Sequence, residues 1–160
     1  EMNGGSLLEE ILAAAEQRGT RIEYVTENME LSLGTAALTV WAPLLPVSED
    51  ENENGLVIEA AQGDFEVFIL GDAPSKAERA LIASAPMPDA EVLFVAHHVS
   101  NTSTCKELLE AITPETAVIS VGYNTYGHPT QKVLDRLAKY NITVLRTDTD
   151  GEITIAAGEG

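Results

Sequence analysis

The feature that most constrains the fold of this chain is a change of pattern near its middle. From about residue 75 onward, short apolar runs alternate with segments of helical spacing; the runs are EVLFVA at 91–96, TAVISV at 116–121 and ITVLRT at 142–147. Strands that alternate with helices indicate βαβ units and parallel pairing. We therefore expect three helices in this part of the chain, at about 75–85, 104–112 and 129–140.

The first half of the chain instead alternates apolar and polar residues with turn residues between the runs, which is typical of antiparallel strands. After an amphipathic helix expected at 6–18, we predict strands at 21–26, 29–34 and 37–43, an acidic loop at 47–55, and a hairpin of 56–60 with 64–70; a last strand is expected at 152–156. Ser-x-x-Glu and Thr-x-x-Glu patterns predict capping boxes at three helix starts, namely Ser6 with Glu9, Ser75 with Glu78, and Thr104 with Glu107.

These elements predict an α/β chain with a mixed sheet and helices on one face. The other face of such a sheet is also apolar on alternate residues and needs a second layer. We therefore expect residues 1–160 to form a single domain that is the C-terminal half of a larger sandwich. On this expectation, an isolated chain would self-associate through the uncovered sheet face or bind the missing half.

The charge of the chain is strongly negative. The formal net charge is −17, and the nine Lys and Arg residues are spread singly along the chain. This disfavours strong autonomous binding of nucleic acid, so metal ions or a basic partner would have to supply positive charge for an anionic substrate. Cys105 is the single cysteine, which excludes a disulfide framework. No apolar stretch approaches the roughly 20 residues of a membrane span, and no cleavable leader is expected.

Four residues with metal-ligand chemistry follow predicted strands: Asp72, His97, His98 and His128. Open α/β sheets bind their ligands at the carboxyl ends of strands. A carboxylate and an imidazole form a partial ligand set for a zinc- or manganese-type ion. The alternative is structural, with the histidines as hydrogen-bonded polar stops and Asp72 as a turn or cap residue. Spacing alone favours the structural alternative.

A hydroxyl-rich turn, SNTST at 100–104, follows the histidine pair. Such a turn either caps the next helix or holds phosphate oxygens. Ser100 has no G-x-S-x-G elbow around it, which argues against a nucleophile paired with His98. His128, in YGHP, is explained equally by a turn that starts a helix.

Five segments, in this order, resemble the C-terminal metallo-β-lactamase-like domain of ComEC-type competence proteins, the DNA-uptake channels of bacteria. They are ENENGLVIEA, FILGD, VLFVAHHVSNTS, AVISVGYNTYGHP and VLRTDTDGEITI. The resemblance runs from about residue 38 to 155, and its most specific part is the histidine pair with the downstream YGHP and RTD segments.

The resemblance implies an αββα sandwich and a metal-dependent nuclease that acts on one strand of incoming DNA. It also implies a position on the outer face of the cytoplasmic membrane. By position, Asp72 is similar to the bridging metal carboxylate and His98 to the last metal histidine, with His97 beside it. Asn54 falls where many relatives have another metal histidine. Ser100 and His128 match positions with a substrate-side or structural role.

Three departures from the family pattern bear on activity. The H-x-H-x-D-H motif, which supplies most metal ligands, is absent; Val99 stands where Gly is usual; and Gly55 stands where Ser is usual. A β-branched Val99 could disturb the metal geometry. We expect the chain alone to be inactive and to bind zinc or manganese weakly, with DNA as the substrate of the intact protein. The alternative is a degenerate, non-catalytic scaffold or interaction module of the same fold.

Overall fold

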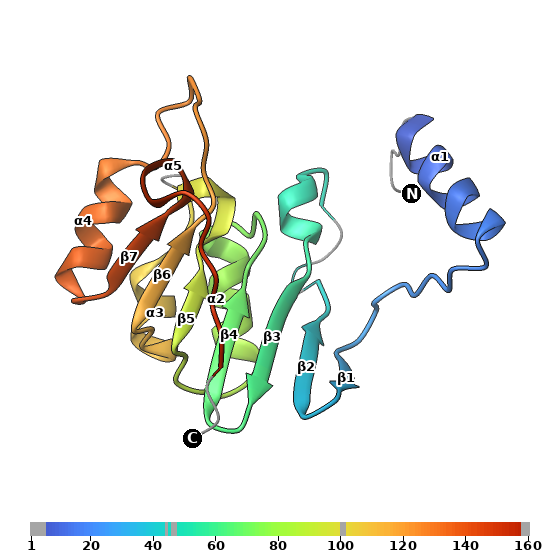
Figure 1. The fold of residues 1–160 in the computed structure, drawn as a ribbon, viewed down its shortest axis with the longest axis horizontal. Helices are drawn as coiled ribbons and strands as arrows, with labels where there is room; N and C mark the ends of the chain where they lie inside the picture. Colours follow the sequence, from blue (N-terminus) through green and yellow to red (C-terminus); the bar gives the residue numbers. More distant parts are fainter. Residues whose placement is uncertain (1–5, 44, 46–47, 100–101, 158–160) are drawn as a thin grey trace.

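One seven-stranded sheet organises the chain in the computed structural model, which describes residues 6–43, 45, 48–99 and 102–157 (Figure 1). The strands lie side by side in chain order: β1 (Met29–Leu33), β2 (Ala36–Trp41), β3 (Val57–Gln62), β4 (Phe65–Ile69), β5 (Val92–Phe94), β6 (Thr116–Ile119) and β7 (Thr143–Arg146). Strands β1 to β4 pair antiparallel, and β4 to β7 pair parallel. The predicted mixed sheet is therefore confirmed, with hairpins first and crossovers afterwards.

Three helices cover one face of the sheet: α2 (Ser75–Ser84), α3 (Lys106–Ile112) and α4 (Gln131–Lys139). Their apolar stripes pack on the strand residues that point toward them. The row Phe68, Leu93 and Ala117, which crosses β4, β5 and β6, is fully buried under these helices. Three shorter elements complete the core region, namely the 3-10 turns η1 (Glu51–Asn54) and η2 (Ala96–Val99) and the helix α5 (Thr147–Asp150).

The opposite face of the sheet carries an unbroken apolar row. Following the pairing register from β1 to β7, the row consists of Met29, Val40, Ile58, Ile69, Phe94, Val118 and Leu145. No helix lies on this face in Figure 1, where the segment after α5 passes in front of the sheet while α2 and α3 lie behind it. Ile69, in the middle of the row, remains 37 % exposed. The row is the side-chain pattern of a sheet that packs on a second layer.

The N-terminal helix α1 (Ser6–Gln17) stands apart from the sheet (Figure 1). Its apolar stripe does not enter the core, because Leu7 is 67 % exposed and Ile11 is 55 % exposed. The helix predicted at 6–18 is thus present, and within the part of the chain that the structure describes its apolar stripe stays largely in solvent.

Two predicted strands were wrong. Residues 21–26 and 152–156 form no strand, although both alternate apolar and polar side chains. The physical reason is that neither segment pairs with a neighbouring strand among the described residues, and an unpaired extended segment gains no ladder hydrogen bonds. Tyr24, in the first of these segments, is largely exposed.

Two predicted capping boxes were also wrong. Helix α2 begins at Ser75 with Pro74 as its N-cap, and α3 begins at Lys106 with Cys105 as its N-cap; neither N-cap residue makes a side-chain capping hydrogen bond. The hydroxyl of Thr104 has no hydrogen-bond partner. The side chain of Ser6 lies outside what the structure describes, so its capping box stays a prediction.

Candidate functional site

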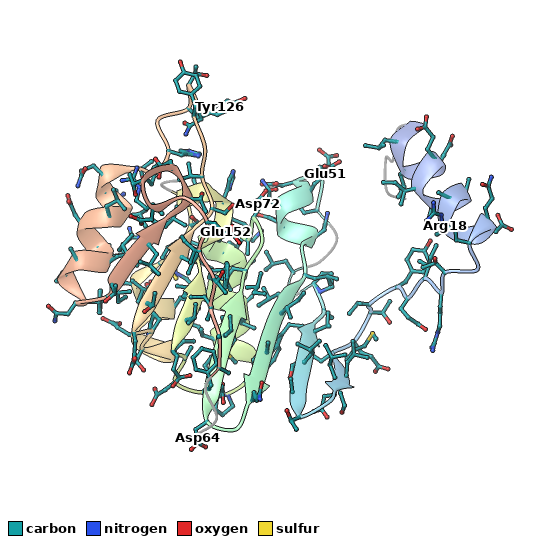
Figure 2. The ribbon with its side chains drawn as sticks, in the orientation of Figure 1. Arg18, Glu51, Asp64, Asp72, Tyr126 and Glu152 are labelled. Atoms are coloured by element: carbon teal, nitrogen blue, oxygen red, sulfur yellow. The ribbon has the colours of Figure 1, made fainter. Side chains whose placement is uncertain are left out.

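The candidate site lies at the carboxyl ends of β4, β5 and β6, where the chain leaves the sheet. A cavity of about 180 Å³ opens there on the side away from the helices, and it is lined by Ile69, Gly71, Asp72, Phe94, Val95, Val118 and Ser120. Its floor is apolar and its rim is polar. Figure 2 shows Asp72 at this end of the sheet and Asp64 at the opposite end. This is the edge at which open α/β sheets bind ligands.

Asp72 is presented to solvent by a tight turn after β4. Leu70 is almost fully buried and anchors the turn, and the backbone N–H of Ala73 donates a 3.1 Å hydrogen bond to the Leu70 carbonyl. Gly71 has a φ of +56°, a left-handed conformation that favours glycine. The turn leaves the Asp72 side chain exposed at the rim of the cavity. The carboxylate is therefore accessible to an ion or a substrate.

His97 follows β5 in a strained conformation. Its φ is +52°, which is uncommon for a residue with a side chain. Its backbone N–H donates a 3.0 Å hydrogen bond to the carbonyl of Gly71, so the histidine is tied to the turn that carries Asp72. The Nδ1 atom of His97 is buried and has no hydrogen-bond partner. A buried imidazole nitrogen without a partner is a group that a bound ion or ligand could satisfy.

His98 lies in the same 3-10 turn, η2, but its side chain and that of Val99 lie outside what the structure describes, as does the whole of Ser100. The backbone of η2 places His98 directly after His97 at the cavity end of β5. Whether the two imidazoles act together therefore remains a prediction from the resemblance.

His128 is brought to His97 by the loop between β6 and α4. The two rings meet edge to face with centroids 6.3 Å apart. Asn124 fixes the position of His128, because its Oδ1 accepts the backbone N–H of His128 at 3.1 Å and its Nδ2 donates to the carbonyl at 2.8 Å. Nothing in the spacing of the two histidines along the chain predicts that their rings are in contact.

Asn54 makes local contacts instead. Its Oδ1 accepts the backbone N–H of Ser48 at 3.0 Å, and its Nδ2 donates to the Ser48 carbonyl at 2.7 Å. Asn54 thus closes the acidic segment 48–54 into a compact turn, and Glu53 in that turn pairs with Lys76 at 3.1 Å. Asn54, which stands where many relatives have a metal histidine, was a candidate for a substrate-side or a structural role, and these contacts support the structural one.

Glu78 supports the start of helix α3, contrary to the capping box predicted for it on α2. It is buried on α2 and accepts the backbone N–H groups of Thr104 and Cys105 at 2.5 and 2.7 Å, so it caps the neighbouring helix α3 instead of its own. Burial raises the pKa of the Glu78 carboxyl above its ordinary value, although these two hydrogen bonds and Arg136 oppose the shift. The available signal was its position three residues before Leu81, on the apolar face of the helix.

Arg136 and Ser103 complete this support. The Arg136 guanidinium donates to the carbonyls of Ser103, at 3.2 Å, and Thr104, and the Ser103 hydroxyl donates to the Ala96 carbonyl at 3.0 Å. The loop that follows η2, the turn that contains His97 and His98 and is called the histidine turn below, is therefore held by contacts with α2, α4 and η2.

Cys105 lies beside Glu78 at the start of α3. Burial, followed by the nearby Glu78 carboxylate, raises the pKa of its thiol to about 12. Cys105 is buried in the hydrophobic core, where it serves as a packing group.

Thr147 holds the start of the loop that carries His128. Its hydroxyl donates to the Val121 carbonyl at 2.7 Å and accepts the Val121 N–H at 2.8 Å. The neighbouring Arg146 and Asp148 form a bidentate pair at 3.0 and 2.7 Å. The RTD segment thus ties the end of β7 to the end of β6.

As a metal centre the described residues are incomplete. Among residues 6–43, 45, 48–99 and 102–157, no group of three or more His, Cys, Asp or Glu side chains could hold a metal ion. Asp72, His97 and His128 carry side chains of metal-ligand chemistry at this edge, and the Nδ1 atom of His97 has no hydrogen-bond partner. They do not fit a closed site formed by this chain alone.

Solved structures confirm the fold. A protein of Parabacteroides distasonis, provisionally described as a metal-dependent hydrolase, superposes with a TM-score of 0.54 over 84 % of this chain and 60 % of that chain, at 13 % identity. Together with the mixed sheet and one-sided helices, this match defines the chain as metallo-β-lactamase-like in fold.

Curated relatives define the family more narrowly. The chain is 36 % identical to ComE operon protein 3 of Bacillus subtilis over 146 residues, 91 % of this chain and 19 % of that protein. It is 36 % identical to Competence protein ComA of Neisseria gonorrhoeae over 113 residues, 69 % of this chain and 16 % of the relative. It is 32 % identical to Recombination protein 2 of Haemophilus influenzae over 117 residues, 72 % of this chain and 15 % of the relative. No family model matches the chain.

The chain belongs to the ComEC-type family of competence proteins, as a metallo-β-lactamase-like domain. It spans about a fifth or less of the length of the curated relatives it matches. In the part of the chain that the structure describes, no helix is both long enough and apolar enough to cross a membrane.

Proposed function

We propose that this chain supplies the C-terminal half of a metal-dependent phosphodiesterase domain that cleaves DNA in a competence protein. The observation that carries the proposal is the meeting of Asp72, His97 and His128 at one edge of the sheet. The Gly71–His97 hydrogen bond and the His97–His128 ring contact hold these residues together, and the Nδ1 atom of His97 lacks a partner there.

The residues that would hold a divalent metal, zinc or manganese, are Asp72 and His98, with His97 beside them. When bound, such an ion polarises a phosphodiester and lowers the pKa of bound water. The chain's own residues would then orient the substrate. Asp72 would present a carboxylate from the β4 turn, and His128, fixed by Asn124, would face the substrate at 6.3 Å from the His97 ring.

The partner of this half would be the segment that carries the H-x-H-x-D-H motif. The apolar row from Met29 to Leu145 supports this proposal, because a second sheet packed on it would bury its exposed members, such as Ile69, and close the cavity beside Asp72. In the absence of that segment, two copies of the chain would use the same row for each other.

The proposed location is the outer face of the bacterial cytoplasmic membrane, where incoming DNA arrives. The support for it is the membership in a family of competence proteins. Protease added to intact spheroplasts should digest a tagged domain while a cytosolic marker protein survives. Digestion only after the membrane is broken would contradict this location.

The test of the function compares cleavage of single-stranded DNA by this chain alone and by the chain joined to its preceding segment. We expect metal-dependent cleavage only in the joined protein, and a loss of at least about 100-fold in the Asp72→Asn variant, because metal ligands and their supports control affinity and rate. Asp64→Asn is the matched control, since Asp64 is equally exposed at the opposite end of the sheet (Figure 2). A fully active isolated chain would contradict the proposal.

The second candidate is a non-catalytic interaction module of the same fold. The net charge of −17 and the absence of a three-residue metal group among the described residues favour it. Cleavage by the joined protein distinguishes the two candidates, because a module would give no metal-dependent cleavage. In a module, Asp72→Asn would also leave assembly with the preceding half unchanged.

A further inference from the structure

Two tyrosines at the tip of the β6–α4 loop are almost completely exposed. Tyr123 is 99 % exposed and Tyr126 is 84 % exposed. The loop projects beyond the carboxyl edge of the sheet (Figure 1), and Tyr126 lies at its far end, on the same side of the molecule as Asp72 (Figure 2). Aromatic rings bury large areas when they bind, so two fully exposed rings on one loop indicate a contact surface.

The Asn124 side chain orders the tip of the loop. Asn124 donates from Nδ2 to the carbonyls of Gly122, at 2.9 Å, and His128, at 2.8 Å. Its Oδ1 accepts the backbone N–H groups of Tyr126 and His128, both at 3.1 Å. The tyrosines are therefore presented on a backbone that is already ordered, which lowers the entropy lost when a ligand binds to them.

The rings of Tyr126, His128 and His97 form a line that leads from the loop tip to the candidate site. The Tyr126 and His128 ring centroids are 6.3 Å apart, and His128 is again 6.3 Å from His97. His97 is tied through its backbone to the turn that carries Asp72. A ligand that lies along these rings from the loop tip would thus arrive at the rim of the cavity.

The two chain segments that carry this line of rings contain no charged residues. In a chain with 26 acidic side chains, residues 92–105 and 116–131, which run from β5 and β6 into the loops at this edge, contain no Asp, Glu, Lys or Arg. An anionic polymer meets less repulsion here than over the acidic remainder of the surface. It also finds no cation in these loops to bind its phosphates, so binding here must come from its uncharged parts.

We propose that Tyr123 and Tyr126 stack on the bases of single-stranded DNA and lead the strand to the edge formed by Asp72 and His97. Stacking on aromatic side chains is independent of sequence and needs no positive charge, and only unpaired bases expose their faces to it. The proposal rests on the proposed function and deepens it, because it assigns the contact with unpaired bases to the two tyrosines of this loop. A protein partner at the same loop is the competing outcome of the test.

The first arm of the test measures binding of this chain, in metal-free buffer with a chelator, to a fluorescein-labelled oligothymidylate. Tyr123→Ala and Tyr126→Ala should each weaken binding about tenfold, whereas Tyr123→Phe and Tyr126→Phe should keep it, since stacking is worth roughly a factor of ten or more per base. Tyr24→Ala is the matched control, because Tyr24 is also exposed but lies in the segment that leads from α1.

An abasic oligonucleotide of the same length and charge separates base stacking from backbone attraction. We expect it to bind far more weakly than oligothymidylate. Three results would overturn the proposal. They are equal binding of the two strands, binding by the alanine variants equal to that of the wild-type chain, and no binding of oligothymidylate at any concentration. A loss of assembly with the preceding half of the domain in the alanine variants would also overturn it, since it would make the loop a protein interface.

The second arm distinguishes this inference from the proposed function. In the joined, metal-loaded protein, Tyr123→Ala and Tyr126→Ala should raise KM for single-stranded DNA about tenfold and leave kcat within about twofold, since the rings contact substrate away from the reacting bond. Cleavage with an unchanged KM would overturn the stacking proposal alone. Binding of oligothymidylate without cleavage of any nucleic acid would overturn the hydrolase proposal alone.

Discussion

The backbone N–H of His97 donates a 3.0 Å hydrogen bond to the carbonyl oxygen of Gly71, and this bond joins the end of β5 to the turn that carries Asp72. Both residues have positive φ angles, +52° for His97 and +56° for Gly71. The edge of the sheet is thus shaped by two unusual backbone conformations, of which only one is at a glycine.

The conformation of His97 predicts a difference between two variants that both remove the imidazole. His97→Gly should be more stable than His97→Ala by about 1–2 kcal/mol, because a left-handed conformation penalises any residue with a Cβ atom. Urea unfolding followed by circular dichroism measures this difference. Equal free energies of unfolding for the two variants would show that the backbone at His97 is not held in this conformation.

Glu78 predicts a pH dependence of stability. Its pKa is raised in the folded chain, chiefly by burial, so its stabilising contribution is present below the ordinary glutamate pKa and is lost as the pH rises through the folded value. Between acid and neutral pH, the wild-type chain should therefore lose stability relative to Glu78→Gln. The matched control is Glu16→Gln, which makes the same substitution at an exposed position on α1.

Glu78→Ala tests the capping role separately from the charge. Removing the carboxylate leaves the backbone N–H groups of Thr104 and Cys105 without their acceptor. We expect a loss of about 2–4 kcal/mol at neutral pH, since each buried donor left unpaired costs roughly 1–3 kcal/mol. A loss no larger than that of an exposed Glu→Ala change would contradict the role.

The hydrogen bonds of Thr147 predict that its hydroxyl holds the start of the β6–α4 loop, which carries Tyr123, Tyr126 and His128. Thr147→Val keeps the shape of the side chain but removes both hydrogen bonds with Val121, so it should destabilise the chain by about 1–3 kcal/mol. Thr147→Ser keeps the hydroxyl and should lose less than half of that. Thermal unfolding of the two variants gives the comparison, and a serine variant as unstable as the valine variant would argue that the methyl group matters and the hydrogen bonds do not.

The apolar row predicts self-association of the isolated chain. Sedimentation velocity should show concentration-dependent dimers or larger species, and Ile69→Asp, in the middle of the row, should reduce them. Ser32→Asp adds the same charge on the other face of β1 and should not. A wild-type chain that stays monomeric at high concentration would contradict the idea that this face packs on a second layer.

The strand order of this sheet could be predicted in outline because its signals are local. The hairpin of β3 and β4 has alternating side chains around a short turn, and β5 and β6 are apolar runs followed by helices. The two wrong strands, 21–26 and 152–156, have the same alternation. What they lack is a neighbouring strand among the described residues, and alternation within one segment carries no information about pairing.

The residues of the candidate site could be proposed one at a time from the sequence, but their arrangement could not. Asp72, His97 and His128 each follow a strand, which is visible in the sequence, whereas the contact of His97 with His128 depends on the course of the loop that Asn124 holds. The role of Glu78 was hidden for a similar reason. Its local pattern with Ser75 suits a capping box, and only the packing of α2 beside α3 shows that it caps the other helix.

The most direct test of the central claim, that Asp72 and the histidine turn form one side of a metal site, is the binding of zinc and manganese measured by titration calorimetry. It should be made on the chain joined to its preceding segment. We predict that Asp72→Asn lowers the affinity at least about 100-fold while Asp64→Asn leaves it unchanged. Equal affinity in the Asp72→Asn and wild-type proteins would contradict the claim.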